Sequence, residues 1–114
     1  MTTLIFKIVH AAEWADVRDV YAGSAKDRVD GFLHFSTAGQ LMSTLTRWYA
    51  DADDLLLVAA DGDALGPALR YEPSRDGALF PHLYRALPLH AVRWVRPIVR
   101  LQGSFVLPDL TASA

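Results

Sequence analysis

The spacing of hydrophobic positions changes along the first part of the chain. Residues 3–9 are mostly apolar and rich in strand-forming types, which predicts a strand with Lys7 on one of its faces. Over residues 11–20 the apolar positions, Trp14 among them, recur at helical intervals and predict a helix. Residues 22–30 are polar and contain a Gly-Ser pair, so a loop is expected there.

A second strand and a second helix are predicted directly afterwards. Residues 31–35 follow an Asp-Gly turn signal and favour a short strand. Thr37 and Gln40 have the spacing of a capping box, in which the two side chains satisfy free backbone groups at the start of a helix. An apolar stripe continues this helix to about residue 49, and its members are Leu41, Leu45 and Trp48.

Strand-like segments dominate the second half of the chain. Residues 55–60 are continuously apolar, which is typical of a strand that is buried on both faces. Residues 68–72 are a further strand candidate, which ends at Pro73 because proline and the residue before it disfavour continuation. Both segments are short, so we expect a sheet of short strands.

Prolines shape the expectations for the last third of the chain. Pro81 interrupts residues 79–87, so this segment is expected to be irregular or to form an edge strand. Leu89 is expected to open a single helical turn. Residues 92–101 predict a long strand in which Pro97 marks an edge position or a bulge.

These elements predict one α+β domain. A chain of 114 residues with 52% hydrophobic and 21% charged residues is sufficient for one core and is not intrinsically disordered. We expect a compact unit over residues 1–107, with five or six mainly antiparallel strands and two helices in the N-terminal half. Residues 108–114 are small and polar and are expected to form a frayed tail.

Composition and charge exclude several classes of protein. The chain has no cysteine, which excludes disulfides, thiol catalysis and thiolate metal sites. Its longest wholly apolar run is too short to span a bilayer, and residues 1–10 do not have the pattern of a signal peptide. A net charge of −2 argues against a protein that coats nucleic acid. The arginines of residues 92–101 fit a solvated face, and the alternative is a track that binds RNA or phosphate. We therefore expect a cytoplasmic protein without a membrane or nucleic-acid partner.

The densest group of candidate functional residues lies where the short strand of residues 31–35 meets the following helix. Strand alternation places His34 and Ser36 on one face. A helix start offers free amides and a partial positive charge, which suit a phosphate or carboxylate. The alternative is structural: His34 is bonded to a backbone carbonyl, while Ser36 and Thr37 only cap the helix.

A second group lies in residues 80–84. Phe80, His82 and Tyr84 surround a stiff proline, and such a loop could form the rim of a pocket that stacks a planar ligand. The alternative is an ordinary packed loop whose aromatic rings fill the core.

Glu72 is the third candidate, because it lies at the end of a predicted strand. A carboxylate there could hold a ribose hydroxyl and stabilise the positive charge of an oxocarbenium-like transition state. The alternative is a surface glutamate that pairs with Arg70 or Arg85.

Several of these motifs occur together in one known family. They are Phe6-Lys7-Ile8 with Trp14, Tyr21 with Gly23-Ser24, Asp30 to Ala38 with Gln40, Tyr71-Glu72, and Phe80 to Tyr84. In this order and spacing they resemble a bacterial family catalogued as domain of unknown function 952, over roughly residues 4–100. The resemblance implies an ADP-ribosyltransferase-like fold, related to that of RNA 2′-phosphotransferases, in which a split sheet holds NAD or another nucleotide.

The resemblance also implies roles for single residues. Transferases of this group have a His or Arg on the first strand, a Tyr or Ser at the second motif and a Glu on a later strand. The corresponding positions here are Lys7, His34 with Ser36, and Glu72, so His34 and Glu72 are the expected catalytic residues. The expected ligand-binding residues are Lys7, Tyr21, Ser24, Ser36, Thr37, Gln40, Phe80, His82 and Tyr84. The segment 21–24 is the expected lid.

Three hypotheses follow from these interpretations. The first is a protein that binds NAD, ADP-ribose or another nucleotide in a polar cleft and transfers a ribosyl or phosphoryl group, with NAD as a substrate. The second is a ligand-binding or interaction domain without catalysis. The third is a metalloenzyme with His34, His82 and Glu72 as a two-His, one-carboxylate set. Their spacing matches no local metal motif, so no metal ligand is assigned.

Overall fold

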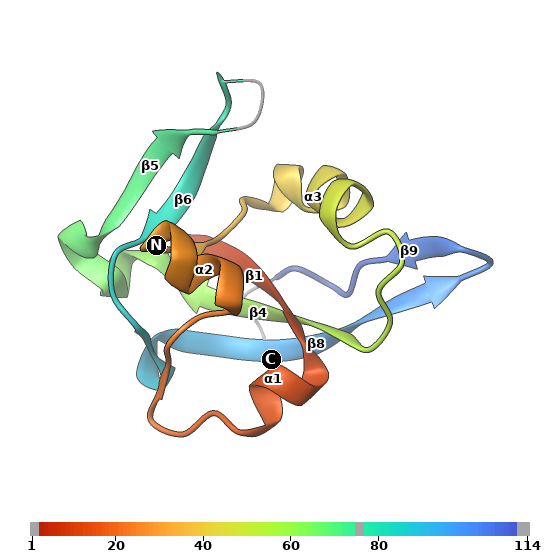
Figure 1. Ribbon diagram of the computed structural model, residues 1–114, viewed down its shortest axis with the longest axis horizontal. Helices are drawn as coiled ribbons and strands as arrows, with labels where there is room; N and C mark the ends of the chain where they lie inside the picture. The colour runs from red at the N-terminus through yellow and green to blue at the C-terminus, as the bar shows by residue number, and fades with distance from the viewer. Residues whose placement is uncertain (1–2, 75–76, 112–114) are drawn as a thin grey trace.

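The larger of the two main sheets is antiparallel and has four strands (Figure 1). The computed structural model describes residues 3–74 and 77–111. In spatial order the strands of this sheet are β1 (Leu4–His10), β4 (Leu55–Asp61), β8 (Val92–Leu101) and β9 (Ser104–Val106). The predictions for the first strand, for residues 55–60 and for residues 92–101 are therefore confirmed.

A smaller antiparallel sheet stands beside the larger one. It has the order β3 (Leu33–His34), β6 (Leu79–Leu83) and β5 (Leu69–Pro73). A separate pair joins β2 (Val20–Tyr21) to β7 (Leu87–Pro88). The two main sheets are linked by a single β-bridge among the described residues, in which the Phe6 and Ser36 backbones exchange hydrogen bonds of 2.9 and 2.8 Å. The predicted α+β class, with mainly antiparallel strands in a split sheet, is confirmed. The described residues form nine strands and three α-helices, however, where five or six strands and two helices were expected, because β2, β7 and the helix of residues 25–30 are too short to give a clear sequence signal.

Short helices connect these strands. The α-helices are α1 (Ala11–Ala15), α2 (Ala25–Asp30) and α3 (Leu41–Trp48). The 3-10 turns are η1 (Ala38–Gln40), η2 (Gly62–Ala68) and η4 (Leu89–Ala91), which confirms the turn expected at Leu89. None of the helices within the described residues is long and apolar enough to cross a membrane.

Strand β4 is apolar throughout because both of its faces are buried. Leu55 and Leu57 belong to one core cluster together with Leu41 and Leu45 of α3. Val58 and Ala60 belong to a second cluster, which also contains residues of β2, β3, β6 and β7. Because successive side chains of a strand point to opposite faces, one continuous hydrophobic run contributes to both core clusters.

Two local predictions in the first thirty-odd residues are wrong. The helix expected over residues 11–20 ends at Ala15, because Val20 and Tyr21 pair with β7. The loop expected over residues 22–30 contains α2. This helix begins with a capping box in which Ser24 Oγ accepts from the Asp27 amide at 3.2 Å and Asp27 Oδ2 accepts from the Ser24 amide at 2.9 Å.

The prediction of an irregular segment or an edge strand around Pro81 is also wrong. Strand β6 lies in the centre of the smaller sheet, between β3 and β5. The Pro81 carbonyl accepts a hydrogen bond of 3.0 Å from the Phe35 amide, but Pro81 has no N–H to return. Strand β3 ends at His34, one residue before Phe35, so its ladder does not need a hydrogen bond from Pro81. The central strand can therefore contain a proline.

The apolar stripe predicted for the second helix is only partly buried. Leu41 and Leu45 are fully buried, whereas the Trp48 side chain is 59% exposed at the end of α3. The capping box of Thr37 and Gln40 forms as predicted, and the Thr37 amide donates to Gln40 Oε1 at 2.9 Å.

Part of the segment predicted as a frayed tail has defined contacts. Leu110 packs against the core cluster that contains Trp94, and the Trp94 indole N–H donates to the Thr111 carbonyl at 2.6 Å. Residues 112–114 of the predicted tail lie outside the described residues.

We expect Leu45→Ala to lower the free energy of unfolding by ~2–5 kcal/mol, because the change leaves a cavity between α3 and the larger sheet. Met42→Ala on the exposed side of the same helix is the matched control and should change stability by about 0.5 kcal/mol or less. Urea unfolding measures both variants. Equal losses in the two would contradict the packing of α3 on the sheet.

Candidate functional site

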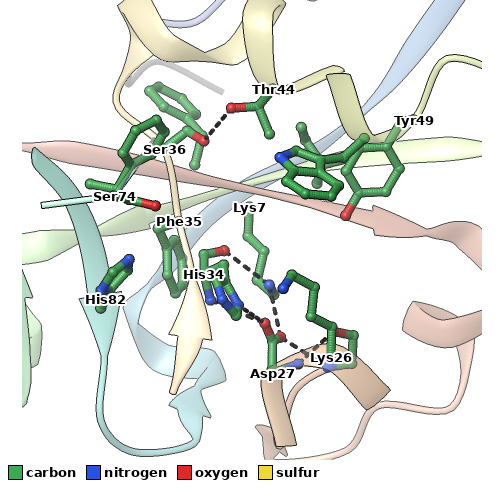
Figure 2. Close-up of a pocket in the computed structure, with 15 residues that line it drawn as sticks. Lys7, Lys26, Asp27, His34, Phe35, Ser36, Thr44, Tyr49, Ser74 and His82 are labelled. Carbon is green, nitrogen blue, oxygen red and sulfur yellow. Dashed lines mark hydrogen bonds and ion pairs between the residues drawn. The ribbon is translucent and has the colours of Figure 1, made fainter. Parts of the chain in front are cut away.

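A pocket of about 260 Å³ lies where the two sheets separate (Figure 2). Strand β1 contributes Lys7, the β3 segment contributes His34 and Ser36, and β6 contributes Phe80 and His82. Helices α2 and α3 complete the wall. The pocket therefore brings together residues that are far apart in the sequence and that belong to both sheets.

The structure divides the predicted site residues into two sets. Those that line the pocket are Lys7, Ser24, His34, Ser36, Phe80 and His82. Those that do not line it are Tyr21, Thr37, Gln40, Glu72 and Tyr84. The first set includes members of two of the three candidate groups, the one around His34 and the one at residues 80–84, whereas the third candidate, Glu72, does not line the pocket.

The residues outside the pocket have other contacts. The Tyr21 side chain is buried in the core, and its hydroxyl donates to Glu13 Oε2 at 2.7 Å. Gln40 accepts from the Thr37 amide and donates to the Leu79 carbonyl at 2.8 Å, which ties the start of η1 to β6. These three residues thus have structural contacts around the pocket, and for Thr37 this is the capping role considered as the structural alternative.

A buried ion pair forms one wall of the pocket. Lys7 Nζ lies 2.8 Å from Asp27 Oδ2, and the two side chains are 5% and 2% exposed. Lys7 also donates to the His34 carbonyl at 2.9 Å. Burial lowers the pKa of Lys7, and the charge of Asp27 opposes this shift. The strand position of Lys7 was predicted, but its partner was not.

Asp27 connects this ion pair to the first histidine. Its Oδ1 lies 2.5 Å from His34 Nδ1 and accepts from the His34 amide at 3.1 Å. Burial alone raises the pKa of Asp27, but hydrogen bonds from His34 and the charge of Lys7 bring it well below its usual range. Asp27 therefore remains ionised and holds Lys7 and His34 in place.

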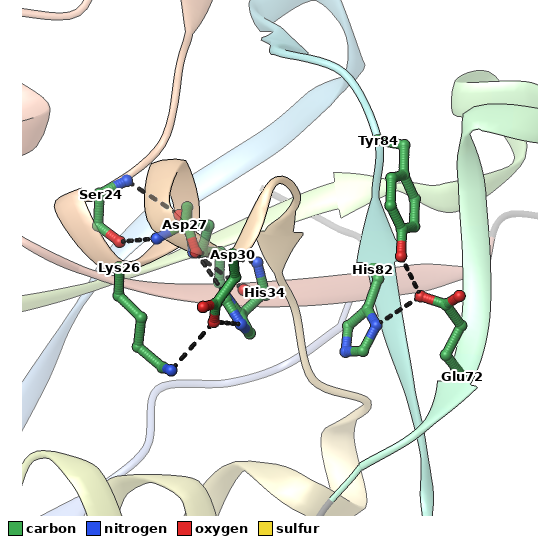
Figure 3. A network of polar contacts seen from close by, with 9 residues as sticks. Ser24, Lys26, Asp27, Asp30, His34, Glu72, His82 and Tyr84 are labelled. Atoms are coloured by element: carbon green, nitrogen blue, oxygen red, sulfur yellow. Dashed lines mark hydrogen bonds and ion pairs between the residues drawn. The ribbon is translucent and has the colours of Figure 1, made fainter.

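The second ring nitrogen of His34 also faces a carboxylate (Figure 3). Nε2 lies 2.9 Å from Asp30 Oδ2, which also accepts from Lys26 Nζ at 3.1 Å. The hydrogen bond from Lys26 lowers the pKa of Asp30. Both nitrogens of His34 can donate at once only when the ring is the positively charged imidazolium.

The second histidine of the pocket has a carboxylate of its own. His82 Nδ1 lies 2.8 Å from Glu72 Oε1, which also accepts from the Tyr84 hydroxyl at 2.6 Å (Figure 3). The hydrogen bond from Tyr84, followed by that from His82, lowers the pKa of Glu72, and the same contact raises the pKa of Tyr84. The Nε2 atom of His82 points away from Glu72. Glu72 and Tyr84 thus act on the pocket through His82.

One aromatic ring fixes the relative position of the two histidines. His34 and His82 are register partners on β3 and β6, with ring centroids 5.8 Å apart. The Phe32 ring stacks on His82 at 4.1 Å and lies 4.6 Å from His34. Phe32 was not a candidate from the sequence, although strand alternation places it on the same face as His34.

Several residues of the site could not be recognised as functional from the sequence. Asp27 carried a usable signal, because Ser24 and Asp27 have capping-box spacing and therefore predict a helix start. Tyr49 lines the pocket, and burial, with the nearby charges of Asp27 and Glu13, raises its pKa to about 12. Its hydroxyl is therefore a neutral donor at pH 7.

The polar residues of the site do not gather around a common metal position. Within residues 3–74 and 77–111, no group of three or more His, Asp or Glu side chains is placed to hold a metal ion. The set of His34, His82 and Glu72 uses the Nδ1 atom of His82 to bind Glu72, so the carboxylate faces a histidine.

Together these features define a small α+β domain with a divided antiparallel sheet and a pocket, lined by two histidines, at the division. The chain belongs to the family described as "Protein of unknown function (DUF952)", whose model matches residues 8–95. The family resemblance predicted from the motifs is therefore confirmed.

The chain is also similar to solved structures of protein CC0527 from Caulobacter crescentus. With the X-ray structure it shares 37% sequence identity and a TM-score of 0.86, covering 91% of this chain and 94% of that one. With the solution NMR structure it shares 38% identity and a TM-score of 0.78, covering 90% of each chain. Comparison with curated proteins gives no match.

We expect Asp27→Asn to lower the free energy of unfolding by ~3–5 kcal/mol at pH 7, because the buried Lys7 ammonium loses its carboxylate. The double variant Lys7→Met with Asp27→Asn should recover part of this loss, because no unpaired charge remains buried. Denaturant unfolding of the single and double variants measures the coupling. Strictly additive losses would show that the two side chains do not stabilise each other.

The same pair predicts a pH dependence of stability. The pKa of Asp27 is lower in the folded chain than in the unfolded chain, so its contribution is present above the unfolded value of about 4. The contribution is lost as the pH falls below that value. The wild type should therefore lose stability more steeply than Asp27→Asn between pH values of about 4 and 2. Parallel slopes in urea unfolding over this range would contradict the shift.

Proposed function

We propose that the pocket binds a nucleotide such as NAD or ADP-ribose and that its two histidines support transfer of a ribosyl or phosphoryl group. The observation that carries the proposal is the pairing of His34 and His82 across β3 and β6, each with a carboxylate at Nδ1. A carboxylate at Nδ1 fixes the tautomer and orientation of an imidazole and stabilises its protonated form.

The two histidines are suited to different tasks. His34 has a carboxylate at each ring nitrogen, so we assign it, with Ser36, to binding and orienting the ribose or phosphate. His82 has Nε2 directed away from Glu72, so we assign it the role of the base. Glu72 then acts as a positioning residue for His82, since it does not line the pocket.

The proposed ribosyl transfer balances with these residues alone. The C–N bond between the anomeric carbon and the nicotinamide ring of NAD breaks, and the ring nitrogen keeps the electron pair. An acceptor hydroxyl or water forms the new bond to the anomeric carbon and gives its proton to His82 Nε2. The ionised carboxylates around the pocket favour the positive charge that develops on the ribose.

The shape of the pocket supports a nucleotide as ligand. Its volume of about 260 Å³ lies just below the range of typical small-molecule sites, roughly 300–1,000 Å³. One half of a dinucleotide would fill it, and the other half would extend over the rim. Phe35 and Phe80 supply apolar walls for a planar ring, while Lys7 and Lys26 supply positive charge for phosphate. We place this activity in the cytoplasm and in an ADP-ribosyltransferase-like fold.

A binding domain without catalysis is the second candidate. It is favoured by the contacts of His34, whose two ring nitrogens are both occupied by carboxylates. Such a domain would bind the same ligand with the same residues but would release it unchanged. Mass spectrometry of the ligand after incubation separates the two candidates.

We expect ADP-ribose or NAD to raise the Tm of the wild type, because a ligand at about 100 times its Kd stabilises the folded chain by ~2.7 kcal/mol. His34→Ala should abolish the shift, whereas His82→Ala should keep most of it and lose turnover of NAD. His90→Ala is the matched control, since His90 is exposed on η4 outside the pocket. Differential scanning fluorimetry measures the shift, and the absence of a shift with both ligands would overturn the proposal.

A further inference from the structure

An exposed tryptophan lies at the edge of the pocket. Trp48 lines the pocket and is the last residue of α3, and 59% of its surface is exposed although its helical spacing predicts burial. Leu41 and Leu45, on the same predicted stripe, are fully buried and pack against the larger sheet. The indole of Trp48 thus contributes to the pocket wall more than to the core.

Two cations flank this indole. Lys26 Nζ lies 5.6 Å from the centroid of the Trp48 ring, and Arg47 Cζ lies 5.7 Å from it. Lys26 belongs to α2 and Trp48 to α3, so the contact spans the mouth of the pocket from one helix to the other. An aromatic face beside positive charge suits a ligand that combines a planar ring with an anionic group.

The contacts of Lys26 indicate where the anionic group would go. Asp30 Oδ2 accepts from Lys26 at 3.1 Å and lies 2.9 Å from His34 Nε2. One exposed carboxylate therefore occupies the donors of both residues at the side of the pocket. A phosphate has the same charge sign and more acceptor oxygens, so it can replace Asp30 on both donors.

We propose that Trp48 is the base-stacking residue of this pocket and that its ligand is a phosphorylated nucleoside. The base stacks on the Trp48 indole at the mouth, a phosphate takes the place of Asp30 on Lys26 and His34, and the ribose lies further in, toward His82. This inference rests on the proposed function and deepens it, since it assigns an orientation to the nucleotide. Every base has a π-face, so Trp48 recognises the presence of a base and not its identity.

The test compares one probe that contains a base with one that does not. ADP-ribose has an adenine base, two riboses and two phosphates, whereas ribose 5-phosphate has one sugar and one phosphate without any base. Binding of each probe to the full chain is measured by isothermal titration calorimetry for the wild type, Trp48→Leu and Trp48→Phe. Met42→Ala is the control variant, because Met42 is exposed on α3 and does not line the pocket.

We expect Trp48→Leu to weaken binding of ADP-ribose by about tenfold or more, because the stacking surface is lost. Trp48→Phe should retain most of the affinity, and both variants should bind ribose 5-phosphate as the wild type does. ADP-ribose should also quench the fluorescence of Trp48. The contribution of Trp48 is obtained as the difference between the fluorescence of the wild type and that of Trp48→Phe. Since the side chain is exposed, the variants should keep the wild-type Tm, which circular dichroism checks.

Three results would contradict the stacking role of Trp48, and they differ in what they imply for the proposed function. Unchanged affinity of Trp48→Leu for ADP-ribose would overturn the stacking role and leave the proposed function standing. Equal weakening of both probes would also overturn it, because Trp48 would then shape the pocket without recognising a base. Failure of the wild type to bind ADP-ribose and NAD at all would overturn the proposed function together with this inference.

Discussion

A buried ammonium group in the middle of a strand can be tolerated only if a carboxylate reaches it, because the unpaired charge would cost several kcal/mol. Lys7 on β1 meets this condition through Asp27, which α2 brings over the strand. The same carboxylate holds the backbone and the ring of His34 on β3. One buried anion therefore connects the larger sheet, a helix and the smaller sheet. The pocket forms beside this junction, and its first histidine is oriented by it.

The division of the sheet leaves the room that the pocket occupies. Among the described residues, the Phe6–Ser36 bridge is the one backbone link between the two sheets. Beyond the bridge, the chain of β3 turns away into η1 and α3, and Pro81 has no N–H with which to extend the ladder toward Phe35. Side chains from both sheets then face a shared space. A continuous sheet at this place would have paired these backbones and closed the pocket.

Most strands could be predicted because their signal is local. The apolar run of β4 and the long strand β8 depend on neighbouring residues and on period-two spacing. The central place of β6, the burial of Lys7 and the exposure of Trp48 depend on contacts between distant segments, which one sequence does not contain. Two of the three candidate groups converge on the pocket, but the sequence did not show which carboxylate contacts each histidine. Asp27, the partner of His34, lay in a segment interpreted as a loop. Glu72 was expected to face the ligand, whereas in the structure it contacts His82.

The two histidine–carboxylate pairs of the pocket differ in a way that follows from their surroundings. Asp27 is buried and already balanced by Lys7, so it can hold His34 rigidly without leaving an uncompensated charge. Glu72 is one-third exposed and shares its oxygen with Tyr84, so water screens the pair that it forms with His82. A rigid, doubly held imidazole suits binding of a fixed anion. The His82 side chain is the less exposed of the two, at 7% against 30% for His34, and it has a carboxylate at only one ring nitrogen. Under the proposed function this difference assigns ligand binding to His34 and proton transfer to His82.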